Sequence, residues 1–159
     1  MNNKKKILVL CTGNSCRSIM AEGLINHFGK DDFQAFSAGS KPTGYVHPMS
    51  LKTLKKSGIF ETDYKSQSWD EFSDMNFDLV ITVCDNAAGE ACPVNLTSAP
   101  KVHWGVEDPA KFKGSMEEIE NEFQPIFTIL AKRTHAMVET YKKDQELNIQ
   151  KLKDIGNLI

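Results

Sequence analysis

The chain has 159 residues, of which 40% are hydrophobic and 25% are charged. This length is sufficient for one domain with a sizeable core, and the composition is that of an ordinary globular protein. The formal net charge of −2 excludes a general electrostatic attraction to nucleic acids or anionic membranes. A small anion would therefore have to be attracted by local features of a binding site.

Two observations bear on the cellular compartment. No apolar run is long enough to cross a bilayer, and the run from Ile7 to Leu10 behind the charged start is too short for a signal peptide. We therefore expect a cytoplasmic protein. In that reducing compartment the four cysteines are expected to be catalytic, metal-binding or buried rather than joined in structural disulfides.

Apolar periodicity predicts strands that alternate with helices. In chain order the elements are a strand at 6–10, a helix at 17–28, a strand at 33–37, a helix at about 48–56, a strand at 77–83 and a short strand at 100–104. This alternation indicates a parallel sheet with helices on both faces. In such a sheet the ligand lies at the carboxyl ends of the strands, so the loop after the first strand is the first candidate site.

The remainder of the chain is predicted to be helical. Apolar residues recur at helical spacing from Met116 to Tyr141, and Pro125 inside this segment predicts a break or kink. Apolar residues between 147 and 158 predict a last short helix or a docked terminus, so the tail 143–159 is expected to pack on the rest. Because no linker or repeat interrupts the chain, we treat residues 1–159 as a single catalytic domain.

The loop after the first strand has the features of an oxyanion site, and it reads Cys11-Thr12-Gly13-Asn14-Ser15-Cys16-Arg17-Ser18. Gly13 and Asn14 tolerate left-handed backbone conformations that let successive N–H groups point inward, and the helix dipole adds positive charge. Arg17 can grip two oxygens of a tetrahedral anion. The same field is expected to favour a thiolate at Cys11, with Ser18 donating a further hydrogen bond to it.

This loop resembles the C-x5-R-S motif of the low-molecular-weight protein tyrosine phosphatases and of the arsenate reductases that share their fold. The resemblance extends from Lys6 to about Tyr141. It implies a single-domain three-layer α/β fold with a four-stranded parallel sheet in the order 2-1-3-4. It also implies that Cys11 is the nucleophile and that residues 12–18 bind the substrate. The motif alone does not choose between the two activities.

A candidate proton donor lies downstream, within His103-Trp104-Gly105-Val106-Glu107-Asp108-Pro109-Ala110. Displacement at phosphorus or arsenic needs a proton for the departing oxygen, and an Asp before Pro is held in extended backbone. Asp108 could instead only begin a turn, and Glu107 is a neighbouring rival. In the family that the chain resembles, the Asp-Pro motif supplies the general acid, and Asp108 is the matching position.

The residues after this motif differ from those of the tyrosine phosphatases, which usually carry aromatic residues there. Here Ala110, Lys111 and Phe112 follow. An open rim without a tyrosine pair is better suited to a small inorganic oxyanion, although Tyr45 or Trp69 could line the pocket from elsewhere.

Two further cysteines form a second candidate feature. Cys84 follows the strongest predicted strand and should emerge at the same sheet edge as Cys11; Cys92 follows after a short loop. The pair could bind zinc with His103, lie inert in the core, form a static disulfide, or act as a thiol relay.

Resemblance supports the relay, because residues 83–93 and the following His103-Trp104-Gly105 look like the redox segment of thioredoxin-coupled arsenate reductases. In that family the first Cys forms an arseno-enzyme adduct, the second attacks the first and releases arsenite, and the third attacks the second. These roles fall on Cys11, Cys84 and Cys92, although the segment between the last two is one residue longer here than in the best-known members. Cys16 is expected to be a packing residue.

Some reductases of this family also bind potassium beside the loop. The residues that match that site in type are Asn14, Glu22, Ser37, Ser68 and Asp70, with Ser68 in place of a Thr. Oxygen ligands suit a hard cation, but each of these residues could equally be a cap or a solvated surface group. No tightly bound cofactor is expected beyond this possible ion.

Three interpretations of the whole chain follow. The first is an arsenate reductase that uses the Cys11, Cys84 and Cys92 relay and an external thiol reductant, either thioredoxin or glutaredoxin with glutathione. The second is a phosphotyrosine phosphatase that forms a phospho-Cys11 intermediate. The third is a non-catalytic, oxyanion-binding regulatory protein, for which a proton donor at Asp108 would have no use. A monomer with no nucleic-acid or membrane partner is expected.

Overall fold

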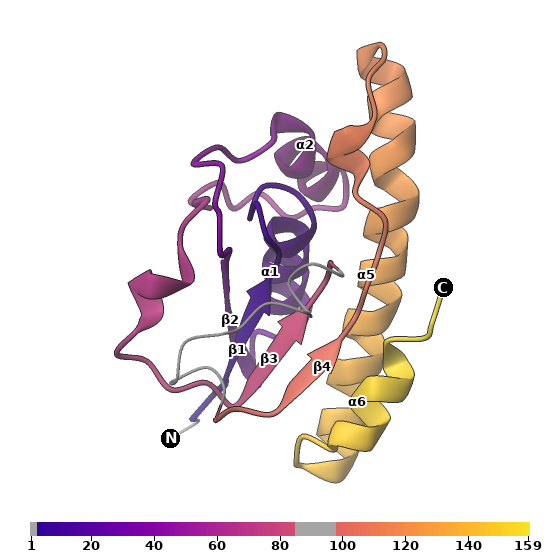
Figure 1. Cartoon of the computed structure of the whole chain (residues 1–159). Coiled ribbons are helices and arrows are strands. Elements are labelled where there is room, and N and C mark those ends of the chain that lie inside the picture. Colours follow the sequence, from indigo (N-terminus) through magenta and orange to yellow (C-terminus); the bar gives the residue numbers. More distant parts are fainter. Residues whose placement is uncertain (1–2, 85–97) are drawn as a thin grey trace.

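The centre of the computed structural model, which describes residues 3–84 and 98–159, is a four-stranded sheet (Figure 1). Its strands are β1 (Lys5–Leu10), β2 (Phe33–Ala38), β3 (Leu79–Thr82) and β4 (Lys101–His103). They lie in the order β2-β1-β3-β4, and all neighbouring pairs are parallel, which confirms the predicted fold. The third strand is shorter than the predicted 77–83, because its pairing with β1 begins at Leu79 opposite Ile7 and ends at Thr82 opposite Leu10, the last residue of β1.

Helical segments cover both faces of this sheet. They are α1 (Arg17–Phe28), α2 (Pro48–Lys56), η1 (Trp69–Phe72), η2 (Pro109–Lys111), α5 (Met116–Asp144) and α6 (Ile149–Ile155). Helices α1, α2 and α5 contact one another in one layer, where Phe33 of β2 packs on Tyr141. Phe36 lies three positions further along β2 and therefore points to the opposite face, where it packs on Phe72 of η1.

Helix α5 continues through Pro125, so of the predicted break or kink the break is wrong (Figure 1). The proline removes the N–H that would donate to the carbonyl of Asn121. Its ring lies on the exposed side of the helix, while Phe123 and Phe127 on either side of it are buried in the core. Burial of this apolar face maintains the helix across the missing hydrogen bond.

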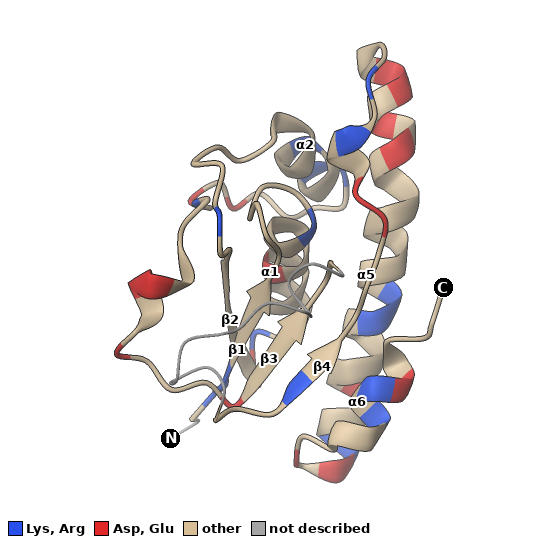
Figure 2. Cartoon of the chain, viewed as in Figure 1, with Lys and Arg blue, Asp and Glu red and all other residues tan. Residues whose placement is uncertain are grey.

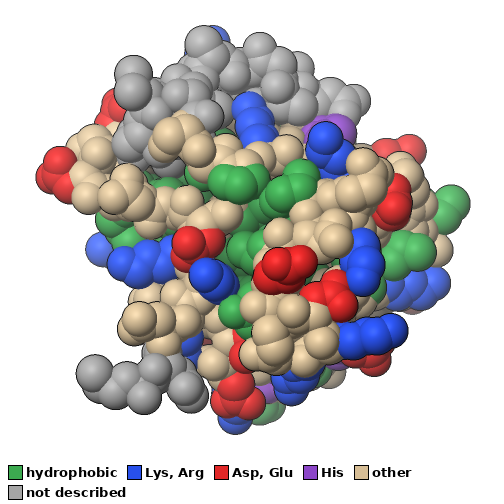
Figure 3. Space-filling view, turned by 90° about the horizontal axis from the view of Figure 1, so that it is seen from below, with side chains coloured by type: hydrophobic (Ala, Val, Ile, Leu, Met, Phe, Trp, Pro, Cys, Tyr) green, Lys and Arg blue, Asp and Glu red, His purple; other side chains and the backbone are tan. Residues whose placement is uncertain are grey.

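The ends of α5 are stabilised by charge and by capping. Ser115 and Glu118 form a reciprocal capping box at its start. Acidic residues occupy the first turn and Lys142 and Lys143 the last turn, as the helix dipole favours (Figure 2). At the amino ends of the strands, acidic and basic side chains lie side by side around small apolar patches (Figure 3).

Helix α6 packs against α5 and β4, and Leu152 and Ile155 on it are buried. Trp104, which follows β4, donates its indole N–H to the carbonyl of Leu152 over 2.9 Å. Among residues 3–84 and 98–159, no helix is both long and apolar enough to cross a membrane.

Candidate active site

The predicted oxyanion loop lies at the carboxyl end of β1 and leads directly into α1. Cys11 continues the strand by donating its N–H to the carbonyl of Ala38 over 3.2 Å, and its side chain is buried. Gly39 makes this arrangement possible, because a Cβ at residue 39 would lie only 2.6 Å from the carbonyl oxygen of Cys11. The end of β2 therefore approaches the loop more closely than a side chain would permit.

Asn14 holds the loop in shape. It has the left-handed backbone conformation that we predicted (φ 47°), whereas Gly13 does not, so the prediction is wrong for the glycine. The Asn14 amide donates to Ser18 Oγ over 2.7 Å and to Ser37 Oγ over 3.0 Å, and its oxygen accepts the N–H of Gln67 over 2.8 Å. This fully buried side chain thus ties the loop to α1, to β2 and to the segment before η1.

Ser18 supports the loop from within. Its hydroxyl oxygen accepts the hydrogen bond from Asn14, and its side chain is fully buried. This bond uses the hydroxyl as an acceptor and leaves its proton available for donation, so the predicted bond to a Cys11 thiolate stays a prediction.

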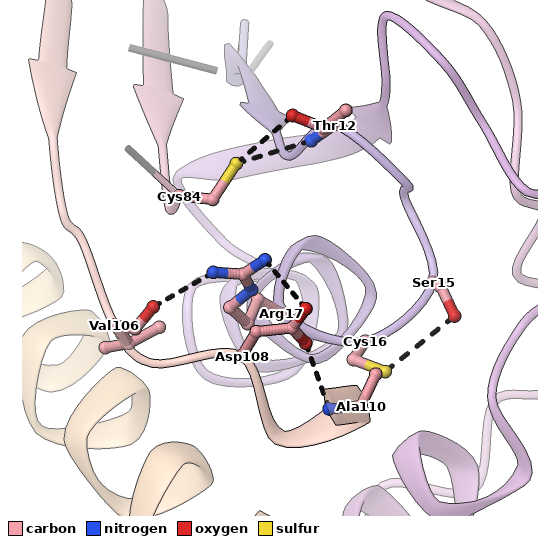
Figure 4. A network of polar contacts seen from close by, with 8 residues as sticks. All are labelled: Thr12, Ser15, Cys16, Arg17, Cys84, Val106, Asp108 and Ala110. Carbon is pink, nitrogen blue, oxygen red and sulfur yellow. Dashed lines mark hydrogen bonds and ion pairs between the residues drawn. The ribbon is translucent and has the colours of Figure 1, made fainter. Parts of the chain in front are cut away.

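Arg17, the first residue of α1, connects this loop to the segment after β4 (Figure 4). Its Nη1 donates to the carbonyl of Val106 over 3.0 Å, and its Nη2 lies 3.5 Å from Asp108 Oδ2. Its Nε is buried and has no hydrogen-bond partner among the described residues. A buried donor without a partner is costly, so this atom is suited to receive an oxygen of a bound oxyanion.

Asp108 is held from two directions. One carboxylate oxygen accepts the N–H of Ala110 over 2.9 Å, which caps η2, while the other faces Arg17. The backbone is extended (φ −87°, ψ 106°), as expected for a residue before proline. The turn-forming interpretation and the proton-donor interpretation are therefore compatible, because the cap orients the carboxylate toward the loop.

A cavity of about 650 Å³ lies between these segments. Its described lining residues are Thr12, Gly13, Arg17, Cys84, Val106, Glu107, Asp108 and Lys111. Tyr45 and Trp69, which we considered as pocket residues, are not in this lining; Tyr45 borders a different hollow with Tyr64 and Glu71. Glu107 remains beside Asp108 at the cavity, but the contact with Arg17 is made by Asp108.

Cys84 lies at the same edge of the sheet as Cys11, as predicted. Its sulfur accepts the backbone N–H of Thr12 over 3.4 Å and lies 3.6 Å from the Thr12 hydroxyl (Figure 4). Cys84 is also the neighbour with the largest effect on the pKa of Cys11. Both cysteines are free and buried at this edge of the sheet, and Cys84 lines the cavity.

The ionisation of Cys11 is subject to opposing influences. Cys84 and burial raise the pKa of Cys11 above its ordinary value, whereas the charge of Arg17 and the N–H of Gly13 lower it. The loop therefore acts in the direction that we expected, but the influences that raise the pKa are the larger. Because the charges of two neighbouring thiolates repel each other, ionisation of one sulfur opposes ionisation of the other.

The other loop residues form its outer wall. The carbonyl of Ser15 accepts the N–H of His47 and the hydroxyl of Ser50, each over 3.2 Å. Cys16 occupies the N-cap position of α1, where its side chain is buried and makes no capping hydrogen bond. Burial raises the pKa of Cys16, as is typical of a packing thiol.

Three of the five candidate potassium ligands form a connected chain. Ser37 Oγ donates to Glu22 Oε1 over 2.5 Å and accepts from Asn14. Ser68 and Asp70 are linked to each other at the start of η1, and Ser68 pairs with Gly39 through the backbone.

Glu22 is the chemical test of this site. Burial raises the pKa of Glu22 to about 7, the hydrogen bond from Ser37 lowers it in part, and Glu61 raises it further. The carboxyl group of Glu22 and the hydroxyl of Ser37 are oxygen ligands of the kind that a hard monovalent cation binds. These two residues therefore fit such an ion.

Other predictions concern residues that the structure does not describe. Cys92 lies outside the described residues, so the last step of the relay has no geometry here. His103 Nδ1 is 2.7 Å from Thr82 Oγ1. Within residues 3–84 and 98–159, no group of three or more His, Cys, Asp or Glu side chains is arranged to hold a metal ion.

Two features of the site escaped the sequence-based reasoning. The contact of Thr12 with Cys84 joins residues 72 positions apart, and the acceptor for Arg17 is a backbone carbonyl, which carries no residue-type signal. Lys111 could have been found, because it follows the Asp-Pro motif by two residues and brings a positive charge to the cavity.

Removal of the second thiol should lower the pKa of Cys11. In Cys84→Ala the largest cause of the raised pKa is gone, so we expect the pKa to fall by roughly one unit or more. The pH dependence of Cys11 alkylation, followed by peptide mass spectrometry, measures it. Cys16→Ala is the matched control and should leave the profile unchanged; an unchanged or raised pKa in Cys84→Ala would contradict the thiol contact.

Glu22 should give the folding stability a pH dependence. Its folded-state pKa of about 7 lies above the ordinary 4.5, so the folded protein holds an extra proton between these values. The free energy of unfolding should therefore fall as pH rises from 4.5 to 7, by roughly 1–3 kcal/mol. Denaturant titrations should show this slope in the parent and not in Glu22→Gln, whereas Glu61→Gln should retain most of it.

The comparisons with known proteins agree with this geometry. The model of the low molecular weight phosphotyrosine protein phosphatase family matches residues 6–147. Arsenate reductase from Halalkalibacterium halodurans is 40% identical over 88% of this chain and 99% of its own length. Arsenate reductase from Bacillus subtilis is 38% identical over 87% of this chain and 98% of its own.

A solved structure gives the same result. An arsenate reductase in the phosphate binding state superimposes with a TM-score of 0.71 and 26% identity, covering 86% of this chain and 98% of the other. The resemblance noted from the loop motif is therefore confirmed across most of the chain. The protein belongs to the low molecular weight phosphotyrosine protein phosphatase family, and within it to the arsenate reductases.

Proposed function

We propose that this protein reduces arsenate to arsenite through a covalent adduct on Cys11 and a relay of thiols. The observation that carries the proposal is that a second cysteine, Cys84, lines the cavity with the guanidinium of Arg17 and the carboxyl group of Asp108, at the sheet edge where Cys11 lies. A phosphatase needs only the Cys11 sulfur at this cavity, because water hydrolyses its phospho-Cys11 intermediate. The relatives named arsenate reductase support the same choice.

Arsenate would bind with its oxygens against the loop N–H groups and Arg17. The unpartnered Nε of Arg17 and its Nη2 provide two parallel donors for two oxygens. The negative charge of the anion is then balanced by the guanidinium and the helix dipole. Lys111 at the rim adds a second positive charge for a doubly charged inorganic anion.

In the first step the Cys11 proton passes to an oxygen of the bound arsenate dianion, and the Cys11 thiolate attacks arsenic. An As–S bond forms and the bond from arsenic to a hydroxyl oxygen breaks. Asp108, in its protonated form, gives its proton to this departing oxygen, which leaves as water.

In the second step Cys84 attacks the sulfur of Cys11. A Cys11–Cys84 disulfide forms, the As–S bond breaks, and its electron pair stays on arsenic, which is reduced from As(V) to As(III) and released as arsenite. The attacking sulfur must be a thiolate, and the N–H and hydroxyl of Thr12 are placed to stabilise that charge. This step requires Cys84 to be within reach of Cys11, which is the arrangement of the resting protein.

In the third step Cys92 attacks Cys84, so that a Cys84–Cys92 disulfide forms and Cys11 is regenerated. An external dithiol then reduces this disulfide by exchange, returning both thiols. We propose thioredoxin as this reductant, a cytoplasmic location and a monomeric enzyme. We also propose that a potassium ion binds beside Glu22 and stabilises the loop. Its positive charge would favour the ionised form of the Glu22 carboxylate.

Arsenate reduction by the purified protein with thioredoxin, thioredoxin reductase and NADPH tests the proposal. We expect steady NADPH oxidation with the parent and a loss of at least about 100-fold in Cys84→Ser and Cys92→Ser. Cys16→Ser is the control and should retain activity. Mass mapping after one arsenate turnover should find a Cys84–Cys92 disulfide.

The phosphatase alternative gives the opposite results. Hydrolysis of an aryl phosphate that survives Cys84→Ser and Cys92→Ser, without arsenate-dependent NADPH oxidation, would show that the protein is a phosphatase. A mixed disulfide with glutathione at Cys84 would redirect the last step to a glutaredoxin-coupled reductant.

Lys111 should contribute to the recognition of the small dianion. In Lys111→Gln we expect KM for arsenate to rise by roughly three- to tenfold at low ionic strength, with kcat little changed. The reason is that the substitution removes a positive charge that attracts the anion but takes no part in the chemical step. Lys113→Gln, two residues further on, is the control and should leave KM unaltered. A fall in kcat at constant KM would contradict a role in binding.

A further inference from the structure

Residues 148–159, here called the C-terminal segment, lie beyond the part of the chain that matches the family model, which ends at residue 147. The segment contains α6 and returns along β4 toward the residues that follow this strand (Figure 1). It contacts the chain just before the motif that carries Asp108. A part of the molecule outside the family match is thus fixed to the base of the active site.

Arg133 on α5 is the centre of this contact. Its side chain is 2% exposed, and all its described hydrogen bonds go to backbone carbonyls. Nη1 donates to Trp104 over 2.8 Å and to Gly105 over 3.2 Å, while Nε donates to Leu158 over 3.0 Å. One guanidinium therefore joins the C-terminal segment to the first residues of the loop that leads to Asp108.

Two further contacts strengthen the junction. The Trp104 indole donates to the carbonyl of Leu152 in α6. Gly156 approaches the same place so closely that an added Cβ would lie 2.6 Å from the His103 carbonyl oxygen and 2.9 Å from Trp104 Cδ1. The backbone of Gly156 has helical angles that any residue can adopt (φ −61°). A larger residue is therefore excluded from this position by lack of space and not by backbone strain.

The loop lies between two hollows. Val106 and Glu107 line the active-site cavity and also a second, open cavity of about 710 Å³, which is lined by residues of α5 and the C-terminal segment. Val106 is half-buried and packs on the core, whereas Glu107 is exposed, so core packing holds this part of the loop at Val106 and not at Glu107. Their described backbone anchor on the sheet is the hydrogen bond from the Val106 N–H to the carbonyl of Val83, at 3.2 Å.

The position of this loop matters for Arg17. The Val106 carbonyl accepts from Arg17 Nη1, and Asp108 pairs with Nη2, so both partners of the guanidinium are on the loop. Trp104 and Gly105 directly precede Val106, so a displacement of their backbone also moves the Val106 carbonyl. Small errors in such groups reduce binding and catalysis strongly.

We propose that the C-terminal segment, together with Arg133, is a positioning element for the active site. By holding the backbone at 103–105 it orients the Val106 carbonyl and Asp108, which in turn orient Arg17 toward the bound oxyanion. The inference rests on the proposed oxyanion site, but not on the thiol relay, because it concerns binding and not the steps that follow.

Inorganic phosphate is the probe for the test, since its binding requires no turnover. Gly156→Ala should move the C-terminal segment away from His103 and Trp104 and weaken phosphate binding by roughly three- to tenfold. Lys151→Ala is the matched control: it removes the 2.7 Å ion pair of α6 with Asp144, which does not reach the loop, and should leave the affinity unchanged. Calorimetry at a temperature where circular dichroism shows every variant folded gives the affinities.

The NMR signals of the arginine Nε–H groups provide a measurement that a general loss of stability would not change. The chain contains two arginines, Arg17 and Arg133, so the Nε–H signals can be assigned with the single variant Arg133→Lys. We expect the Arg17 Nε–H signal of the phosphate-free protein to shift in Gly156→Ala and in Arg133→Lys, and to stay in place in Lys151→Ala.

Several outcomes would overturn the proposal. These are unchanged phosphate affinity and an unmoved Arg17 signal in Gly156→Ala, equal effects in Gly156→Ala and Lys151→Ala, or a parent that does not bind phosphate at all. If the affinities and signals change as expected but arsenate is not reduced, the positioning role stands and the proposed relay fails. If arsenate is reduced but these measurements show no change, the relay stands and the positioning role fails.

Discussion

The guanidinium of Arg17 joins two loops whose residues are 89 positions apart in the chain, and the rest of the site is arranged around that bridge. One loop brings the nucleophile, the other brings the carboxyl group, and the parallel sheet places both at its carboxyl edge. The bridge leaves Nε without a described partner. A tetrahedral anion would complete the coordination of this side chain, so binding energy and orientation arise from the same group.

Each of the two buried thiols opposes the ionisation of the other. Cys84 and burial raise the pKa of Cys11, while Arg17 and the Gly13 N–H lower it. The reaction proposed here needs one thiolate at a time: Cys11 in the first step and Cys84 in the second. A pair that shares its charge satisfies this requirement, and Thr12 is placed to hold the charge once it lies on Cys84.

The sequence predicted the parts of the molecule that follow from local rules. Strand and helix periodicity led to a parallel sheet covered by helices, and the family resemblance carried by the loop motif implied its strand order. The loop motif and the Asp-Pro dipeptide pointed to most of the residues that meet at the cavity. The errors have physical causes. Tertiary burial of Phe123 and Phe127 carried α5 through Pro125. The hydrogen bond from the inward-turned Asn14 to Ser18 was not foreseen, because it joins two buried side chains within the loop. The raised pKa of Cys11 depends on a neighbour 73 positions away, which no local pattern reveals.

The burial of Cys11 and its neighbour Cys84 also bears on the oxidation of the nucleophile. Oxidants such as peroxide react with thiolates much faster than with protonated thiols. Because burial and Cys84 both raise the pKa of Cys11, they also favour its less reactive, protonated form. A sulfenic acid formed on Cys11 would have a thiol close by with which to condense to a reducible disulfide, so the sulfur that serves the proposed reaction is also placed to limit irreversible oxidation.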